Sequence, residues 1–244
     1  MKWLFLNTTR RLQHAFSNPR YAATMVLREA TWADERFLAI VTGSSAWRIR
    51  KFLDEPAHAR EFMQHLSGSE GKLHTAPFQS ADLYAKKVLI QYAIIRAMRP
   101  DIVVETGIAN GVSSAYVLLA LRKNEGGVLH SVEIGDTSYL PAECQPGWIV
   151  PTWLRAPWKV HLGDATKLLP ELLRTLPPID IFIHDSLHTE EQMTFEFETA
   201  YPFLQTSGCL IADDASWNNA FRQFAKSQGL RNAQIIRGIG VAAK

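Results

Sequence analysis

The stretch DIVVETGIANGVSSAYVLLALRKN, residues 101–124, has the clearest secondary-structure pattern of this chain. It opens with a short run of β-branched residues, passes through a turn that contains glycine, and continues with the apolar spacing of a helix. A strand that leads through a tight turn into a helix is a building unit of parallel α/β sheets. The stretch therefore predicts the first strand of such a sheet and a helix that packs on it.

Further strands and helices alternate after this unit. The predicted strands cover residues 128–133, 158–162, 179–184 and 208–213. The predicted helices between and after them cover residues 165–176, broken at Pro170, 189–204 and 216–228. Two short strands in residues 233–244 are too closely connected for a parallel crossover, so they predict an antiparallel edge. We expect a doubly wound, Rossmann-like α/β sheet that is mostly parallel and ends in an antiparallel C-terminal hairpin.

The N-terminal part of the chain has helical apolar spacing instead. Gly68 and Gly71 are expected to interrupt it. A further helix is predicted to begin after Ser80, a suitable N-cap, and to end before Pro100. We therefore expect an N-terminal helical extension, residues 1–75, and one domain that spans residues 76–244.

The composition is that of an ordinary globular protein. Of 244 residues, 47% are apolar and 20% are charged, and the net charge of +2 is too small to indicate nucleic-acid binding. The two cysteines do not form a CxxC motif, which argues against a zinc site and suits a reducing compartment. No apolar run approaches the roughly 20 residues of a membrane span. The sequence predicts a cytoplasmic protein without a transmembrane segment.

The turn after the first predicted strand is a candidate ligand loop. Ligands of α/β sheets bind at the carboxyl ends of the strands. Gly107 and Gly111 permit close backbone approach, and free amides at the start of the next helix favour an anionic group. Ala109 stands where a dinucleotide-binding GxGxxG motif has its middle glycine, which weakens a pyrophosphate interpretation.

Acidic residues end the first three strands in order. Glu105 suits a cationic group, Glu133 can accept hydrogen bonds from ribose hydroxyls, and Asp164 either contacts a base amino group or caps the following helix. Together they describe a nucleoside pocket without a phosphate site, which fits S-adenosylmethionine. The predicted cofactor-binding residues are Glu105, Gly107, Ala109, Gly111, Ser113, Ser114, Glu133, Asp164, Ala165 and Asp185.

Carboxylates also end the fourth and fifth strands. We expect these strands to be neighbours, so that Asp185, Asp213 and Asp214 lie close together. Oxygen ligands of this kind favour Mg²⁺, Mn²⁺ or Ca²⁺ over zinc. The alternative is that Asp214 caps a helix and Asp185 pairs with a lysine or arginine.

A histidine follows this candidate metal site. His188 lies three residues after Asp185, and its ordinary pKa near 6.5 suits a general base at neutral pH. A structural histidine is the alternative. His184, within the strand, is interpreted as a packing or supporting residue.

These motifs resemble one known group of enzymes. VVETGIANGVSS, SVEIGD, HLGDATKLLP, FIHDSLHT and GCLIADD, within residues 75–244, are similar to class I S-adenosylmethionine-dependent methyltransferases. The closer similarity is to bacterial sugar and macrolide O-methyltransferases and the so-called cephalosporin hydroxylases. The resemblance implies metal ligands at Asp185, Asp213 and Asp214 and a catalytic base at His188. The family often has Glu-Asp where this chain has Asp213 and Asp214.

The resulting hypothesis is an S-adenosylmethionine-dependent O-methyltransferase. Its acceptor would be a hydroxyl of a small molecule or sugar, and a divalent metal, Mg²⁺ first, would assist His188 and Asp185. Two alternatives stay open: a nicotinamide-dependent oxidoreductase on a related sheet, and a non-catalytic S-adenosylmethionine-binding module. The N-terminal helices are a candidate surface for a homo-oligomer.

Overall fold

The structure of the chain is a computed structural model that describes residues 27–76 and 83–244. The predicted cap Ser80 and the beginning of the N-terminal extension, residues 1–26, lie outside the described residues. The helix predicted to begin directly after Ser80 begins instead at Lys86, with Ala85 as its N-cap.

A seven-stranded sheet with the order β3-β2-β1-β4-β5-β7-β6 forms the centre of the molecule. Strands β1 to β5 are parallel, whereas β7 runs antiparallel to β5 and β6 antiparallel to β7. The mostly parallel sheet and its antiparallel C-terminal hairpin are therefore confirmed. The strands are β1 (Ile102–Thr106), β2 (Val128–Glu133), β3 (Trp158–Leu162), β4 (Ile179–His184), β5 (Leu204–Ala212), β6 (Ala233–Ile236) and β7 (Ile239–Ala243).

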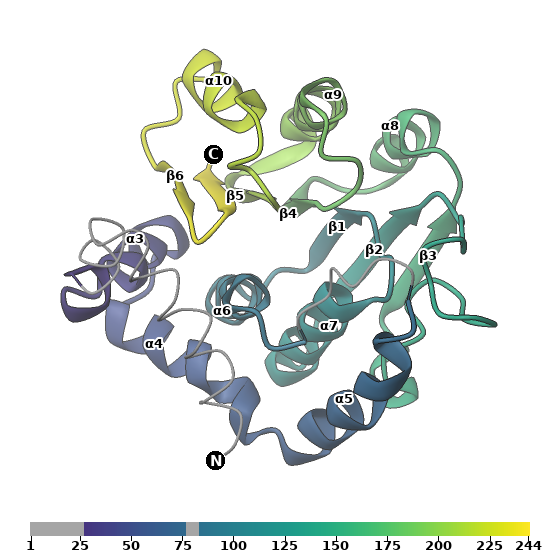
Figure 1. The fold of residues 1–244 in the computed structure, drawn as a ribbon. Coiled ribbons are helices and arrows are strands. Elements are labelled where there is room, and N and C mark those ends of the chain that lie inside the picture. Colours follow the sequence, from purple (N-terminus) through teal and green to yellow (C-terminus); the bar gives the residue numbers. More distant parts are fainter. Residues whose placement is uncertain (1–26, 77–82) are drawn as a thin grey trace, which may run out of the picture.

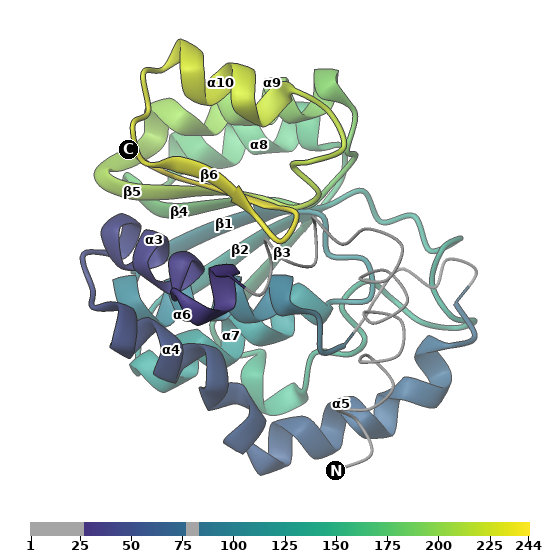
Figure 2. The ribbon, with the colours of Figure 1, turned by 60° about the vertical axis from the view of Figure 1, so that its left-hand side comes forward.

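Helices cover both faces of the sheet (Figure 1). Figure 2 shows α8, α9 and α10 on one face, and α6 and α7 on the other with α3 and α4 outside them. The helices of the N-terminal part and the first covering layer are α3 (Ala33–Thr42), α4 (Ala46–Asp54), η1 (Glu55–His58), α5 (Arg60–Leu73), α6 (Lys86–Met98) and α7 (Val112–Asn124). The remaining helices are η2 (Thr152–Leu154), α8 (Ala165–Thr175), α9 (Glu190–Ala200), η3 (Tyr201–Phe203) and α10 (Ala220–Ser227).

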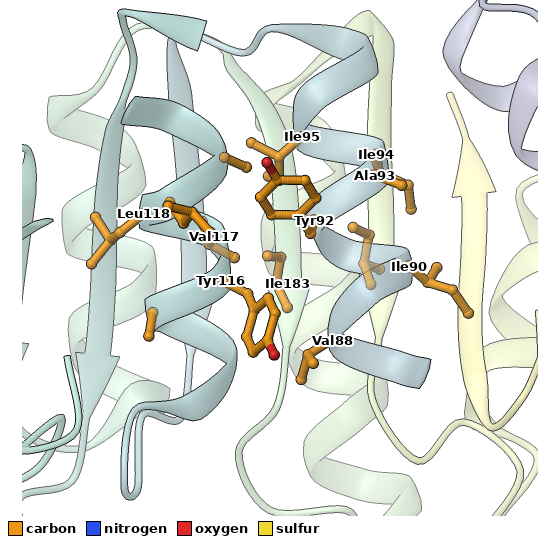
Figure 3. Close-up of a cluster of buried hydrophobic side chains, with 14 of the residues drawn as sticks. Val88, Ile90, Tyr92, Ala93, Ile94, Ile95, Tyr116, Val117, Leu118 and Ile183 are labelled. Carbon is orange, nitrogen blue, oxygen red and sulfur yellow. The ribbon is translucent and has the colours of Figure 1, made fainter. Parts of the chain in front are cut away.

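The alternation of strand residues divides the core into two layers. Ile181 and Ile183 of β4 join the buried cluster beneath α6 and α7, while Phe182 joins the cluster beneath α8 to α10. In Figure 3, Ile183 lies beside Tyr92 of α6 and Tyr116 of α7. Since successive residues of a strand point to opposite faces, a strand that is apolar throughout is buried on both sides. This double burial holds the strand ends rigidly.

The N-terminal helices share the core of the α6–α7 layer. Phe37 of α3, Ile49 of α4 and Leu66 of α5 are buried in the same cluster as α6 and α7. The amphipathic faces of these helices therefore pack on the domain rather than stand apart from it. None of the helices in the described ranges is long and apolar enough to cross a membrane.

Two predicted helix breaks are wrong. Gly68 and Gly71 lie inside α5, and Pro170 lies inside α8. In each helix, buried leucines before and after the breaker pack on the domain. Burial of a large apolar side chain contributes about 1.5–3 kcal/mol, which offsets the roughly 1 kcal/mol propensity cost of a helical glycine. For α8 the same burial compensates for the one hydrogen bond that a proline removes.

Candidate active site

The ends of β4 and β5 lie side by side, as the sequence predicts. His184 is in register with Ala212, and the backbone amide of Asp213 donates to the carbonyl of His184 at 2.8 Å. The amide of Asp185 in turn donates to the carbonyl of Thr106 at the end of β1, also at 2.8 Å. These bonds bring the residues that follow three strands to one place at the carboxyl edge of the sheet.

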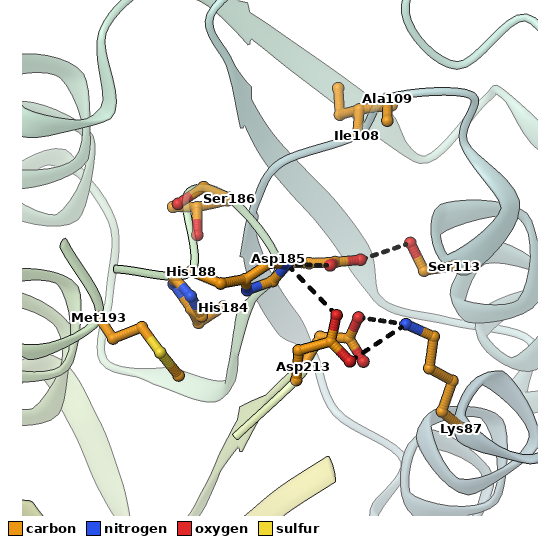
Figure 4. Close-up of polar contacts among 12 residues, drawn as sticks. Lys87, Ile108, Ala109, Ser113, His184, Asp185, Ser186, His188, Met193 and Asp213 are labelled. Carbon is orange, nitrogen blue, oxygen red and sulfur yellow. Dashed lines mark hydrogen bonds and ion pairs between the residues drawn. The ribbon is translucent and has the colours of Figure 1, made fainter. Parts of the chain in front are cut away.

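An acidic cluster with one histidine occupies this place (Figure 4). One potential ligand atom each from Asp185, His188 and Asp213 lies within 4.8 Å of the others. Asp214 is not part of that compact group, although its Oδ2 lies 3.8 Å from His188 Nε2. Asp185 and Asp213 are therefore together as predicted, and His188 completes the compact group, whereas Asp214 lies at its edge, within 3.8 Å of His188 and of Lys87.

Lys87 of α6 also reaches this cluster, and the sequence offered no specific signal for it. Its Nζ donates to Asp213 Oδ2 at 2.5 Å and lies 3.8 Å from Asp214 Oδ1. The alternative, in which Asp214 caps a helix and Asp185 pairs with a lysine or arginine, is not what the structure has: Lys87 pairs with Asp213, and the next helix begins at Ala220 with Asn219 as its N-cap. Two adjacent lysines at the start of a helix look like solvated residues, and only the tertiary fold brings one of them here.

The charges of the cluster shift one another's pKa values. Burial, and then the charge of Asp213, raise the pKa of Asp185 well above its usual range and raise the pKa of Asp214. Burial opposes protonation of Lys87, but the charge of Asp213 outweighs it and raises the pKa of that amine. Like charges crowded in a partly buried site favour the uptake of protons or cations.

The residues present fit a hard divalent cation. Three carboxylates and one imidazole form an oxygen-rich donor set, which suits Mg²⁺, Mn²⁺ or Ca²⁺. Asp213 is only 4% exposed, and its Oδ1 is buried without a hydrogen-bond partner among the described residues. An unpartnered carboxylate oxygen in a buried site is costly unless a cation or donor binds it.

His188 lies beside the acidic cluster, in contact distance of Asp185 and Asp214. Its Nε2 is 3.8 Å from Asp185 Oδ1, and its ring packs edge-on against Trp217, with centroids 5.3 Å apart. Burial and the neighbouring His184 lower the pKa of His188. The imidazole is therefore neutral near pH 7, which is the form that can accept a proton.

A buried network supports the loop that carries Asp185 and His188. Glu196 of α9 lies beneath it, and His184 Nδ1 is 2.6 Å from Glu196 Oε2. Ser186 and Thr106 donate to the same carboxylate. Burial alone would raise the pKa of Glu196, but these hydrogen bonds outweigh it and lower the pKa. His184 is thus a supporting residue, as interpreted from the sequence, and Glu196 is a partner that the sequence did not indicate.

The turn after β1 that contains Gly107 and Gly111 is packed closely against the backbone of two other loops. A Cβ at Gly107 would lie 2.0 Å from the carbonyl oxygen of Asp185, and one at Gly111 would lie 2.6 Å from the Cα of Gly147. Both glycines have positive φ, of 85° each. Ala109 has a φ of 48° and is exposed. The close approach at both glycines is therefore to the protein's own loops, around Asp185 and Gly147, and close approach by a ligand stays a prediction.

Two predicted cofactor residues hold this turn in place. The Oε2 atom of Glu133 accepts hydrogen bonds from the amides of Ile108 and Ala109, at 2.7 and 3.0 Å. Its Oε1 accepts from the hydroxyl of Tyr139 at 2.8 Å. Ser113 Oγ lies 3.4 Å from Asp185 Oδ2 and so connects the start of α7 with the acidic cluster.

Asp164 is the N-cap of α8, which is one of the two roles predicted for it. Its Oδ1 accepts from the backbone amide and the hydroxyl of Thr166, each at 2.8 Å. These bonds lower the pKa of Asp164. Ala165 is the first residue of α8. Both capping hydrogen bonds are accepted by Oδ1. The other predicted role of Asp164, a contact to the amino group of a nucleoside base, stays a prediction.

Glu105 is fully buried between β1, β2 and α7. Its Oε1 accepts hydrogen bonds from Ser114 and Ser131, at 2.6 Å each, while its Oε2 has no partner among the described residues. Burial raises the pKa of Glu105 to about 7. Because its side chain and that of Ser114 have no exposed surface, any effect on a bound ligand would pass through the surrounding structure.

This buried acid leads to a prediction for stability. Its pKa is about 4.5 in the unfolded chain and about 7 in the folded protein, so stability falls as the pH rises between these values. Replacing Glu105→Gln removes that loss. We expect the free energy of unfolding of the variant, relative to the wild-type, to rise by up to about 3 kcal/mol between pH 5 and pH 8.

Denaturant unfolding at several pH values measures this difference. Any constant cost of burying the amide of the variant cancels between two pH values. Glu171→Gln, at an exposed position of α8, is the matched control and should show no such slope. A difference between Glu105→Gln and the wild-type that does not vary with pH would contradict the prediction.

A comparison with protein families finds a methyltransferase domain in the part of the chain that contains this site. Residues 104–215 match the family model of a methyltransferase domain. The matched segment and the sheet order are those of a methyltransferase domain and are similar to those of class I S-adenosylmethionine-dependent methyltransferases. No curated protein matches it in sequence.

Solved structures share the fold at low sequence identity. TomG from Streptomyces achromogenes, an O-methyltransferase in complex with S-adenosylmethionine, is 18% identical, with a TM-score of 0.56 over 73% of this chain and 88% of its own. An O-methyltransferase from Bacillus cereus is 15% identical, with a TM-score of 0.54 over 76% of this chain and 90% of its own. The methyltransferase PaMTH1 from Podospora anserina is 13% identical, with a TM-score of 0.54 over 74% and 86%.

Proposed function

We propose that the chain transfers a methyl group from S-adenosylmethionine to a hydroxyl oxygen of a small molecule or sugar. One observation carries the proposal: His188 and Asp185 lie together at the carboxyl edge of the sheet, beside the glycine turn of a methyltransferase domain. A hydroxyl acceptor needs a base, and a neutral histidine within reach of the crevice is a suitable one.

The cofactor would bind over the ends of β1 to β3. S-adenosylmethionine supplies a methyl group that its sulfonium makes electrophilic. The turn around Gly107 and Gly111 would approach it closely, and Glu133 would hold that turn while it faces the ribose. Asp164 and Ala165 would lie near the base, and Ser113 and Asp185 near the reacting end. These assignments are made because the residues lie at or just after the carboxyl ends of β1 to β4, where ligands of such sheets bind.

The acceptor would bind over the ends of β4 and β5. His188 would take the proton of the acceptor hydroxyl at Nε2, and the nearby carboxylates of Asp185 and Asp214 would stabilise the imidazolium that forms. Holding the acceptor oxygen in line with the methyl group contributes much of the rate in such bimolecular reactions. Trp217 is exposed and its ring contacts that of His188, so it would pack against the acceptor.

A divalent metal fits the same cluster. Asp185, Asp213 and Asp214 would hold it, with Mg²⁺ as the first candidate and Mn²⁺ or Ca²⁺ as alternatives. When bound, such an ion would bring an acceptor hydroxyl to the site and lower its pKa. The buried, unpartnered Oδ1 of Asp213 supports this assignment.

Calorimetry and a transfer assay together test the proposal. We expect the wild-type protein to bind S-adenosylhomocysteine and not NAD, because the turn lacks the pyrophosphate motif. Transfer of a labelled methyl group to a panel of catechols, diols and sugars should then identify an acceptor. Binding of NAD instead would support the oxidoreductase alternative, which the methyltransferase match disfavours. Cofactor binding without transfer to any acceptor would support a non-catalytic module. We place the protein in the cytoplasm and keep the N-terminal helices as its candidate homo-oligomer surface.

A further inference from the structure

Lys87 is held in the acidic cluster by a rigid part of the fold. It is the second residue of α6, whose following residues Val88, Ile90 and Tyr92 are buried in the core (Figure 3). Its partner Asp213 lies 126 positions further along the chain. The adjacent Lys86 turns elsewhere and pairs with Glu29, with 3.2 Å between Nζ and Oε1. The two neighbouring lysines therefore have different surroundings, and only Lys87 enters the cluster (Figure 4).

Lys87 and a divalent metal would need the same carboxylate. Asp213 is nearly fully buried, its Oδ2 accepts from Lys87, and its Oδ1 has no partner among the described residues. A metal bound by Asp213 would either displace the ammonium or lie a few ångströms from it. Two like unit charges about 4 Å apart change a binding constant by about fivefold in water and by about a thousandfold near a protein surface.

We propose that Lys87 is a tethered cation that competes with a divalent metal for Asp213, so that the chain binds the metal weakly. This inference deepens the proposed function, because it concerns the control of the same site. It differs from an ordinary surface ion pair, whose removal changes stability little and does not alter metal binding. In the absence of metal, Lys87 would keep the three carboxylates partly neutralised and the cluster intact.

Binding of Mn²⁺ to the full chain tests the competition. Electron paramagnetic resonance of free Mn²⁺ reports affinity without acceptor and without turnover. We expect Lys87→Gln and Lys87→Met to bind Mn²⁺ at least about tenfold more tightly than the wild-type, because the competing charge is gone. Lys87→Arg, which keeps the charge, should stay as weak as the wild-type. Lys86→Met is the matched control and should leave Mn²⁺ affinity unchanged.

A second variant locates the effect. Adding Asp213→Asn to Lys87→Gln should abolish the gain, because the metal would lose the carboxylate for which Lys87 competes. Thermal melts and S-adenosylhomocysteine binding show that each variant is folded, and Lys87→Gln keeps a hydrogen-bond donor if Lys87→Met is unstable. Equal or weaker Mn²⁺ binding by folded Lys87→Gln would overturn the proposal. So would the absence of Mn²⁺ binding by all variants at millimolar metal.

The competition and the proposed function can fail separately. Tight Mn²⁺ binding by Lys87→Gln without methyl transfer by the wild-type would support the competition and contradict the transferase assignment. Methyl transfer by the wild-type with unchanged Mn²⁺ affinity in Lys87→Gln would do the opposite.

Discussion

Replacing His188→Gln is expected to lower the turnover of methyl transfer by about 100-fold to 10,000-fold, the range that a general base contributes. The reason is that glutamine can still form hydrogen bonds in the crevice but cannot take the proton of the acceptor hydroxyl. S-adenosylhomocysteine affinity should stay close to that of the wild-type, because His188 lies at the ends of β4 and β5 rather than over β1 to β3. Single-turnover transfer of a labelled methyl group, with calorimetry for the cofactor, measures both quantities.

The control for this variant is another histidine. His58→Gln changes an exposed residue of η1 in the N-terminal part and should leave transfer unchanged. Mn²⁺ affinity then separates two roles of His188, since its ring also lies within the compact ligand group. Slow transfer with unchanged Mn²⁺ affinity is expected of a base. A large loss of Mn²⁺ affinity would identify His188 as a metal ligand, and turnover at the wild-type rate would exclude it from the chemistry.

Periodicity and turn residues were sufficient to predict the sheet. The five parallel strands, their alternation with helices and the closing hairpin all depend on local patterns, and each element lies within a few residues of its predicted place. The neighbouring ends of β4 and β5 follow from doubly wound topology, so Asp185 and Asp213 could be placed together from the sequence. The predicted breaks failed because long-range burial, which a local pattern does not contain, outweighed helix propensity.

The environment of the site depends on contacts between distant segments. Lys87 reaches Asp213 because α6 shares a buried cluster with residues of β4 and β5, and Glu196 reaches His184 because α9 lies on the other face of the sheet (Figure 2). No spacing within the chain encodes either contact. Gly107 is a further example. The sequence indicates that another group comes close to the backbone at this glycine, but only the fold shows that this group is the carbonyl of Asp185.

Replacing Gly107→Ala is expected to disrupt the fold and the site together. The new Cβ would lie 2.0 Å from the carbonyl oxygen of Asp185 and 2.9 Å from the Cα of Ser186, and both are backbone atoms that cannot rotate away. The φ of 85° at this position adds strain for any residue with a side chain. Strain and overpacking of this kind each cost about 1–3 kcal/mol, so we expect a loss of about 3 kcal/mol or more in the free energy of unfolding.

The same change should weaken cofactor binding and methyl transfer beyond the effect on folding. Relief of the contact must move the loop of Asp185 away from β1 and break the 2.8 Å bond between its amide and the carbonyl of Thr106. Denaturant unfolding and S-adenosylhomocysteine titration of the folded fraction measure the two effects. Gly126→Ala is the matched control, because a Cβ there would meet nothing within 4 Å. Wild-type stability and cofactor affinity in Gly107→Ala would mean that the ends of β1 and β4 are not locked together, and the placement of Asp185 in the site would then fail with them.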